Sequence, residues 1–304
     1  MNKLILLLLP FLMSCYTNTG EIGNPSQPRL DRISFQSTAT DLERDFYVYV
    51  PSGYEDDERE WPILLFLHGN GERGDGKEEL DFVLVHGPMY EAWVQKRDFP
   101  FIIIAPQLPM WGMDEVGYIK DRKIEDIPRR MEDSIPPRND KFGSNNPMDG
   151  NPAKELNYGP EGLPVGYPDM EEDLLSIIEM VKDQYRTDEN RYYLAGLSYG
   201  GFGTWFMASK HPEMWAAINP VVGWGHPELM KPIAENKIPV WVFAGGRDEA
   251  VPVQYFYEGM NKLEELGHDV RFTTEEDMNH DVWTRVYAGD DIYNWLLSHS
   301  LENR

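Results

Sequence analysis

The sequence of 304 residues predicts a doubly wound α/β domain with a mostly parallel sheet. Two observations carry this prediction. Apolar residues run continuously through five segments, as in strands that are buried on both faces, and helical patterns lie between these segments. A hydrophobic content of 41% is also enough to bury a sizeable core. The apolar segments span residues 62–69, 101–106, 191–198, 215–223 and 238–246.

The remaining elements follow in chain order within an expected domain at 31–304. Residues 32–38 and 45–51 alternate enough to predict an antiparallel strand pair before the first apolar segment. Residues 269–276 predict a last strand, and residues 281–299 predict a last helix. Between the strands, apolar periodicity predicts helices over residues 78–97, 169–186, 200–210, 227–236 and 253–266.

One segment, residues 107–167, does not fit the alternation of strands and helices. It is rich in Pro, Gly, Asn and charged residues, and only a short stretch near 120–133 has a helical pattern. Such a length is far above that of an ordinary connection. The segment starts at the carboxyl end of a predicted strand, which is the edge of an open parallel sheet that carries ligands. We therefore expect this insertion to form a wall or lid of the active site.

The N-terminus predicts export and lipid attachment. Residues 1–14 combine a short positive region with an apolar run that is too short for a stable membrane span, as in a signal peptide. The residues "LMSC" resemble the bacterial lipobox, which implies lipidation of Cys15 and a tether over 15–30. Cys15 is the single cysteine, so an intrachain disulfide is impossible. We expect a lipid-anchored protein of the bacterial cell envelope, periplasmic or on the outer-membrane surface; the alternative is an ordinary signal peptide.

Charge and composition exclude some partners. The formal charge of −24 would repel phosphate backbones, so a nucleic-acid partner is not expected. The sequence has no H-E-x-x-H motif and no cysteine pair, so no metal site is expected either.

The clearest chemical signal is "GLSYG", residues 196–200, which fits G-x-S-x-G between a predicted strand and a predicted helix. In that setting the motif is a sharp turn that exposes a nucleophilic serine. Ser198 is therefore the predicted nucleophile. A serine hydroxyl is a poor nucleophile until a base takes its proton, and histidine titrates in the right range for this.

His280 is the predicted base, because it follows the last strand at the sheet edge that carries Ser198. His268 would lie at the opposite edge. A carboxylate must hold the imidazole in position. Asp248 follows the strand 238–246 at the same edge, with Glu249 as its nearest rival.

The reaction also needs donors for the oxyanion and groups that hold the substrate. The glycine-rich loop after the first buried strand predicts the backbone amide of Asn70 as one donor, with Gly69 as the alternative, and the amide of Tyr199 as the other. Trp224 follows a core strand at the active-site edge and Trp111 opens the insertion. Both are expected to bind an acyl group or a sugar, with core packing as the alternative.

Four stretches together resemble the α/β-hydrolases, outside the insertion and over residues 32–300: "LHGNGERG", "GLSYGGFGTW", "GGRDEAVPV" and "NHDVWTRVY". The chain order of serine, acid and histidine is that of this superfamily. The chain resembles predicted esterases and peptidases related to polyhydroxybutyrate depolymerases and feruloyl esterases, similar to carbohydrate esterase family 1. This resemblance implies a serine hydrolase without a metal or other cofactor, and several members act on plant cell-wall esters.

We therefore expect a serine esterase that acts through an acyl-enzyme on an ester substrate linked to carbohydrate, with feruloyl or acetyl esters of plant polysaccharide favoured. A serine peptidase of the prolyl oligopeptidase-like class is one alternative, because amides and esters share the mechanism. A non-catalytic, glycan-binding surface lipoprotein is the other. Such a protein would be expected to lack members of the triad, and all three candidates are present.

Overall fold

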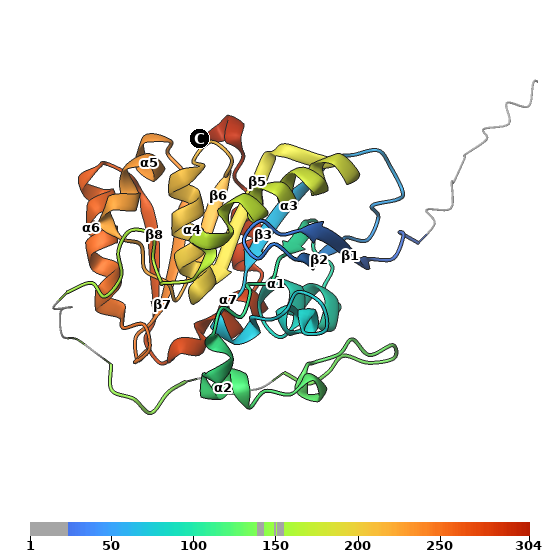
Figure 1. Ribbon diagram of the computed structural model, residues 1–304. Coiled ribbons are helices and arrows are strands. Elements are labelled where there is room, and N and C mark those ends of the chain that lie inside the picture. The colour runs from blue at the N-terminus through green and yellow to red at the C-terminus, as the bar shows by residue number, and fades with distance from the viewer. Residues whose placement is uncertain (1–23, 139–142, 149, 151–154) are drawn as a thin grey trace, which may run out of the picture.

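An eight-stranded sheet in the order β1-β2-β4-β3-β5-β6-β7-β8 forms the centre of the molecule (Figure 1). The computed structural model describes residues 24–138, 143–148, 150 and 155–304. β2 pairs antiparallel with β1 and with β4, and every other neighbouring pair is parallel. The predicted antiparallel pair and the predicted α/β sheet are confirmed. The strands are β1 (Arg29–Gln36), β2 (Glu43–Val50), β3 (Trp61–Leu67), β4 (Ile102–Ala105), β5 (Thr187–Leu197), β6 (Ala217–Val221), β7 (Val240–Gly245) and β8 (Val270–Glu275).

Helices cover both faces of the sheet, and this explains the continuous apolar runs. Every residue of β3, β4, β6 and β7 is buried. One face packs against α3 (Glu171–Gln184), α4 (Tyr199–Lys210), α5 (Met230–Glu235) and α6 (Phe256–Glu265). The other face packs against residues 80–94, α7 (Trp283–Ala288) and α8 (Asp291–Leu297).

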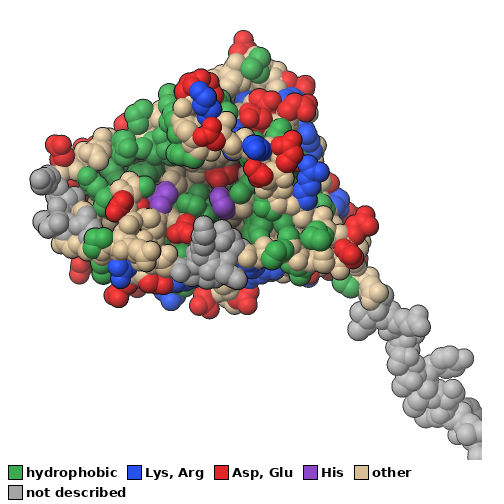
Figure 2. Space-filling view, turned by 90° about the horizontal axis from the view of Figure 1, so that it is seen from below, with side chains coloured by type: hydrophobic (Ala, Val, Ile, Leu, Met, Phe, Trp, Pro, Cys, Tyr) green, Lys and Arg blue, Asp and Glu red, His purple; other side chains and the backbone are tan. Residues whose placement is uncertain are grey.

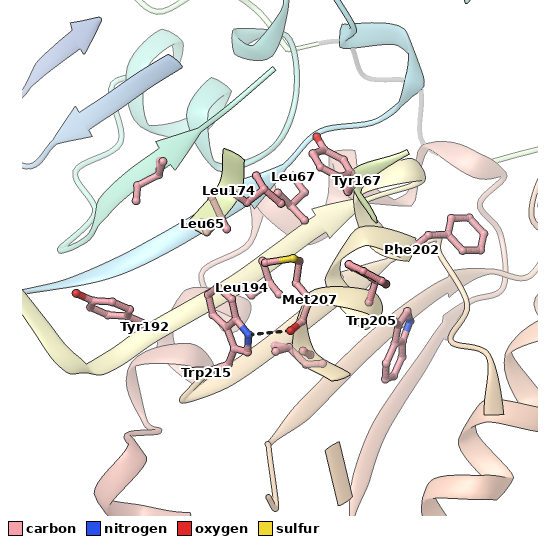
Figure 3. Packing of buried hydrophobic residues seen from close by; sticks show 14 of the residues in the cluster. Leu65, Leu67, Tyr167, Leu174, Tyr192, Leu194, Phe202, Trp205, Met207 and Trp215 are labelled. Atoms are coloured by element: carbon pink, nitrogen blue, oxygen red, sulfur yellow. Dashed lines mark hydrogen bonds between the residues drawn. The ribbon is translucent and has the colours of Figure 1, made fainter. Parts of the chain in front are cut away.

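Large side chains fill the core between the first face and α4. Trp205 and Trp215 are fully buried there, and the indole N–H of Trp215 donates to the carbonyl oxygen of Met207 at 3.3 Å (Figure 3). A buried indole therefore keeps its hydrogen bond while its rings exclude water. This packing fixes α4, whose first turn adjoins the candidate nucleophile.

The predicted helix over 78–97 is wrong as a single element. The segment instead forms a 3₁₀ turn (Leu80–Leu84), the short α1 (Gly87–Met89) and a π-helical turn (Tyr90–Val94). Gly87 has φ +74°, and Pro88 has no N–H to continue a helix. The predicted last helix likewise divides into α7 and α8, because the backbone is extended at Gly289.

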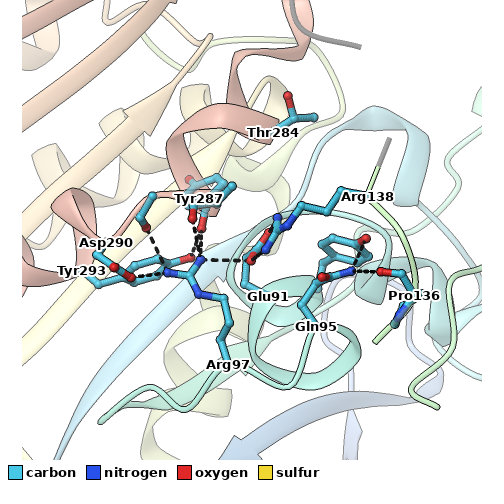
Figure 4. A network of polar contacts seen from close by, with 12 residues as sticks. Glu91, Gln95, Arg97, Pro136, Arg138, Thr284, Tyr287, Asp290 and Tyr293 are labelled. Atoms are coloured by element: carbon cyan, nitrogen blue, oxygen red, sulfur yellow. Dashed lines mark hydrogen bonds and ion pairs between the residues drawn. The ribbon is translucent and has the colours of Figure 1, made fainter. Parts of the chain in front are cut away.

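The described part of the insertion is irregular but attached to the domain. Its short helical pieces are Met113–Glu115, α2 (Gly117–Lys120) and Ile124–Asp126. Nη1 and Nη2 of Arg138 each donate to the buried carboxylate of Glu91 at 2.5 Å (Figure 4). Gln95 donates to the carbonyl oxygen of Pro136 at 3.1 Å in the same network. These contacts hold part of the insertion against the residues that precede β4.

No helix among the described residues is long and apolar enough to cross a membrane. The predicted signal peptide, Cys15 and most of the predicted tether lie outside the described residues.

Candidate active site

Ser198, His280 and Asp248 form a continuous chain of hydrogen bonds. His280 Nε2 lies 2.9 Å from Ser198 Oγ, and His280 Nδ1 lies 2.7 Å from Asp248 Oδ2. Ser198 lies between β5 and α4, Asp248 follows β7 and His280 follows β8. The three side chains meet because the carboxyl ends of parallel strands lie at one edge of the sheet. Their distances are those that a nucleophile, a base and an orienting acid require.

Asp248 is held so that one oxygen is directed at the histidine. Its side chain is fully buried, and its Oδ1 accepts from the backbone N–H groups of Ala250 and Val251, both at 2.8 Å. Its Oδ2 is then left for His280. Glu249 is exposed, and its backbone N–H donates to Asn279 Oδ1 at 3.3 Å. The structure therefore places Asp248 and not Glu249 against the imidazole.

The glycines on either side of Ser198 are required by close backbone packing. A Cβ on Gly196 would lie 2.2 Å from the carbonyl oxygen of Gly200, and one on Gly200 would lie 1.8 Å from that of Leu67. Ser198 itself has φ +51° and ψ −113°, a conformation that costs a non-glycine residue about 1–3 kcal/mol. Its N–H donates to the carbonyl oxygen of Val221 at 2.9 Å. The turn is thus fixed by β3 and β6, its neighbours in the sheet.

The predicted oxyanion donors lie beside this turn. Tyr199 is the first residue of α4, so its N–H has no partner within the helix. Gly69 and Asn70 line the same cavity as Ser198, and a Cβ on Gly69 would lie 3.6 Å from Ser198 Cβ. The loop therefore passes close to the nucleophile.

His68 and Arg73 hold this loop in place. Burial lowers the pKa of His68 to about 3, so its ring is neutral. It donates from Nδ1 to the carbonyl oxygen of Gly69 at 2.6 Å and accepts at Nε2 from the N–H of Leu108 at 2.8 Å. Arg73 is fully buried, and burial lowers its pKa. It donates to Asn70 Oδ1 at 2.6 Å.

Arg73 also joins the loop to the insertion. Its other nitrogens donate to the carbonyl oxygens of Pro109 at 2.8 Å and Val165 at 2.6 Å, near the two ends of the insertion. Its guanidinium lies 4.9 Å from the ring centre of Tyr199 and 5.9 Å from that of Trp111. Trp111 therefore packs beside a buried cation and is not among the residues that line the cavity.

The triad opens into a cavity of about 630 Å³. Figure 2 shows this face with hydrophobic side chains gathered around a recess in which two histidines are visible. Four aromatic side chains form one side of the cavity, which we call the aromatic wall: Tyr158, Phe202, Trp224 and Tyr255. The ring centre of Trp224 lies 6.1 Å from Tyr158, 5.9 Å from Tyr255 and 5.4 Å from Phe202. The predicted position of Trp224 at the site thus agrees with the structure.

Polar residues line the side of the cavity that follows β3 and β4. Glu72 is buried next to Gly69, and burial raises its pKa to about 7. His86 lies 3.7 Å from it, measured from Nε2 to Oε1, and partial desolvation of the His86 side chain lowers its pKa. Arg122 lies at the same side and donates to the carbonyl oxygen of Gly71 at 2.6 Å.

Solved structures of several hydrolases resemble the chain over most of its length. A thermostable esterase is 27% identical with a TM-score of 0.57, and the match covers 89% of this chain and 63% of that one. A CE1 ferulic acid esterase from Anaeromyces mucronatus, in complex with ferulic acid, is 18% identical with a TM-score of 0.52 and 93% coverage of both chains. An acylaminoacyl peptidase from Pyrococcus horikoshii is 13% identical with a TM-score of 0.55, over 93% of this chain and 43% of that one.

The chain has the α/β-hydrolase fold. The model of the prolyl oligopeptidase family matches residues 169–231 of this chain, a range that contains Ser198. No curated protein sequence matches the chain. The chain spans about 63% of the length of the thermostable esterase.

Several residues that line the cavity escape prediction from sequence. Tyr255 and His86 reach the cavity only because the sheet brings distant segments together. Phe202 lies on α4, four residues after Ser198. Glu72 carries a weak local signal, since it stands two residues after Asn70 in the oxyanion loop. Within the described ranges, no group of three or more His, Cys, Asp or Glu side chains is placed to hold a metal ion.

Proposed function

We propose that this protein is a serine carboxylic-ester hydrolase that acts through an acyl-enzyme. The observation that carries the proposal is the hydrogen-bonded chain from Ser198 through His280 to Asp248, at 2.9 and 2.7 Å, in a cavity of about 630 Å³. The esterases among the similar structures support it.

The geometry supports a two-step reaction. Ser198 Oγ attacks the ester carbonyl carbon while His280 Nε2 takes its proton. The amides of Tyr199 and Asn70 stabilise the oxyanion, and the tetrahedral intermediate collapses as His280 returns the proton to the leaving alcohol. Water then repeats the attack on the acyl-enzyme and releases the acid. Asp248 keeps the imidazole in the tautomer that presents Nε2 to Ser198.

Feruloyl or acetyl esters of plant polysaccharide are the proposed substrates. The aromatic wall offers flat apolar surfaces for a phenolic acyl group or a sugar ring. Tyr158 of this wall comes from the insertion, as proposed for a segment that shapes the site. The ferulic acid complex of the Anaeromyces mucronatus esterase supports an aromatic acyl group.

A serine peptidase is the second candidate, because the prolyl oligopeptidase family matches the segment around Ser198. Both candidates require the same triad, so substrate turnover must separate them. A complete triad argues against a purely glycan-binding protein.

Two assays on the purified protein test the proposal. A fluorophosphonate probe is expected to label the intact protein and not the Ser198→Ala variant. A panel of methyl cinnamates, aryl acetates and peptide anilides is expected to show ester turnover well above anilide turnover. Trp224→Ala is expected to lower kcat/KM for methyl ferulate more than for phenyl acetate, by about 10-fold. Preferred cleavage of the anilides would replace the esterase assignment with a peptidase.

A further inference from the structure

Two polar side chains in the cavity, Glu72 and His86, have unused hydrogen-bonding capacity. Glu72 is 7% exposed, and its buried Oε2 has no hydrogen-bond partner of standard geometry among the described residues. Its Oε1 lies 3.7 Å from His86 Nε2. This separation is too long for a hydrogen bond, but a hydroxyl oxygen can lie about 2.8 Å from both atoms at once. A buried polar group without a partner is costly unless a ligand or water satisfies it.

Trp283 completes this polar group of residues. Its indole N–H is buried and has no partner among the described residues. Its ring lies between the two histidines, 5.5 Å from the ring of His86 and 5.3 Å from that of His280. The face of the cavity next to the catalytic base is therefore lined by an acid, an imidazole and an indole.

The position of these residues relative to the triad indicates which part of the substrate they meet. Gly69 lies between Glu72 and Ser198. A Cβ added to Gly69 would lie 3.1 Å from Glu72 Oε2 and 3.6 Å from Ser198 Cβ, so the carboxyl group is near the nucleophile. His280 delivers its proton to the leaving alcohol, which must lie within hydrogen-bonding reach of Nε2. Trp283 and His86 extend from that same histidine.

We propose that Glu72, His86 and Trp283 form a subsite for a hydroxyl group of the leaving alcohol, carried on the carbon next to the ester oxygen. The substrates of this site are then esters of polyhydroxy alcohols such as sugars. This inference rests on the proposed ester hydrolysis at Ser198. A hydroxyl group both donates and accepts, which suits a neutral imidazole beside a carboxyl group whose pKa is raised to about 7.

A second cavity adjoins this side of the first. It has a volume of about 250 Å³ and shares Val85, His86 and Trp283 with the first cavity. Pro136 also lines it, so part of its surface comes from the insertion. A chain of sugars that is esterified at one residue would extend from the subsite into this space.

Ethyl cinnamate and 2-hydroxyethyl cinnamate test the inference, because they differ by one hydroxyl group on the alcohol. The intact enzyme is expected to favour the 2-hydroxyethyl ester in kcat/KM by about 10-fold, since a site that binds a hydroxyl group discriminates against an analogue without it. Glu72→Met and His86→Phe are each expected to reduce this ratio to about 2 or less. Glu72→Gln retains a donor and an acceptor and is expected to keep most of it. Glu58→Met, an exposed residue outside the cavity, is the matched control and is expected to keep the full ratio.

The outcomes separate the inference from the proposed function. Turnover of both esters at equal kcat/KM by the intact enzyme overturns the subsite and leaves the esterase assignment in place. Turnover of neither ester, without fluorophosphonate labelling, overturns both. If Glu72→Met does not fold, His86→Phe gives the same readout, because the His86 side chain is 34% exposed. If His86→Phe keeps the preference for 2-hydroxyethyl cinnamate over ethyl cinnamate, His86 does not bind the hydroxyl group of the alcohol. If the variants lose only the discrimination between methyl cinnamate and methyl 4-hydroxycinnamate, these residues bind the acyl group instead. Either result overturns the subsite.

Discussion

At the scale of single residues, the active site is determined by a few side chains whose surroundings leave them one role. One oxygen of Asp248 accepts hydrogen bonds from two backbone N–H groups, and the other oxygen binds His280. Ser198 and His280 could be predicted from sequence because a glycine-bounded turn and a histidine after the last strand are local signals. Glu72 and His86 could not, because their significance depends on the 3.7 Å between them.

The triad assignment predicts a clear order among acid variants. Asp248→Asn is expected to lower kcat about 10⁴-fold, because the amide no longer stabilises the required tautomer of His280. Glu249→Gln is expected to leave kcat nearly unchanged, since Glu249 is exposed and Asp248 is the partner of His280 Nδ1. Ester hydrolysis by the two purified variants checks this. A larger loss in Glu249→Gln than in Asp248→Asn would contradict the assignment.

Glu72 predicts a pH dependence of stability. The pKa of a glutamate is 4.5 in the unfolded chain, and burial raises that of Glu72 to about 7. Between these values the folded protein binds a proton that the unfolded chain has released, so the contribution of Glu72 to stability falls as the pH rises through this window. Glu72→Gln removes the effect. The difference in free energy of unfolding, variant minus wild type, is expected to increase by on the order of 3 kcal/mol from pH 4.5 to pH 7.

Urea unfolding at several pH values measures this difference. His68 and His86 have lowered pKa values, so their contributions to stability change with pH in the opposite direction. Both histidines are present in the two proteins that are compared. Glu58→Gln is the control, and its curve is expected to run parallel to the wild type. A constant difference between Glu72→Gln and the wild type would show that Glu72 titrates normally.

At the scale of elements, buried strands are easier to predict than their connections. All eight strands are present where the apolar runs and alternation predict them. The apolar runs mark strands such as β3, β4, β6 and β7, because burial on both faces requires continuous apolar residues. The predicted helix over 78–97 is interrupted at Gly87, where the backbone turns with φ +74°. A Cβ at this position would lie 2.1 Å from the ring of Phe66. The insertion is attached by side chains such as Arg138 and Arg73, whose partners are distant carbonyl and carboxylate groups that no periodicity reveals.

Arg73 provides the test at this scale. Arg73→Lys keeps the charge but cannot reach Asn70, Pro109 and Val165 together, because lysine lacks the planar fork. We expect a loss of about 2–4 kcal/mol in unfolding free energy and a fall in kcat, since the oxyanion loop loses a support. Arg59→Lys, at an exposed position, is the control. Unchanged stability in Arg73→Lys would mean that the insertion is held by its other contacts.

At the scale of the whole molecule, the candidate site lies in the described domain, and the location of the protein depends on the N-terminal segment. We propose that the protein is lipidated at Cys15 and anchored to a membrane of the bacterial cell envelope. The wild type is expected to fractionate with membranes and the Cys15→Ser variant with the soluble fraction, because stable anchoring requires more than one acyl chain, as a bacterial lipoprotein carries. Mass spectrometry of the mature protein checks the modification. An unmodified Cys15 in membrane-free protein would contradict the proposal.

Arg73 has a consequence beyond stability. Because Pro109 and Val165 bind the same guanidinium, the insertion leaves the domain and returns to it at one closed neck. The entropy of closing a loop grows only slowly with its length, so segments of many lengths can be carried on the same neck. The insertion can therefore be replaced by another segment while the rest of the domain is kept. Such a replacement could change the range of substrates without altering the triad.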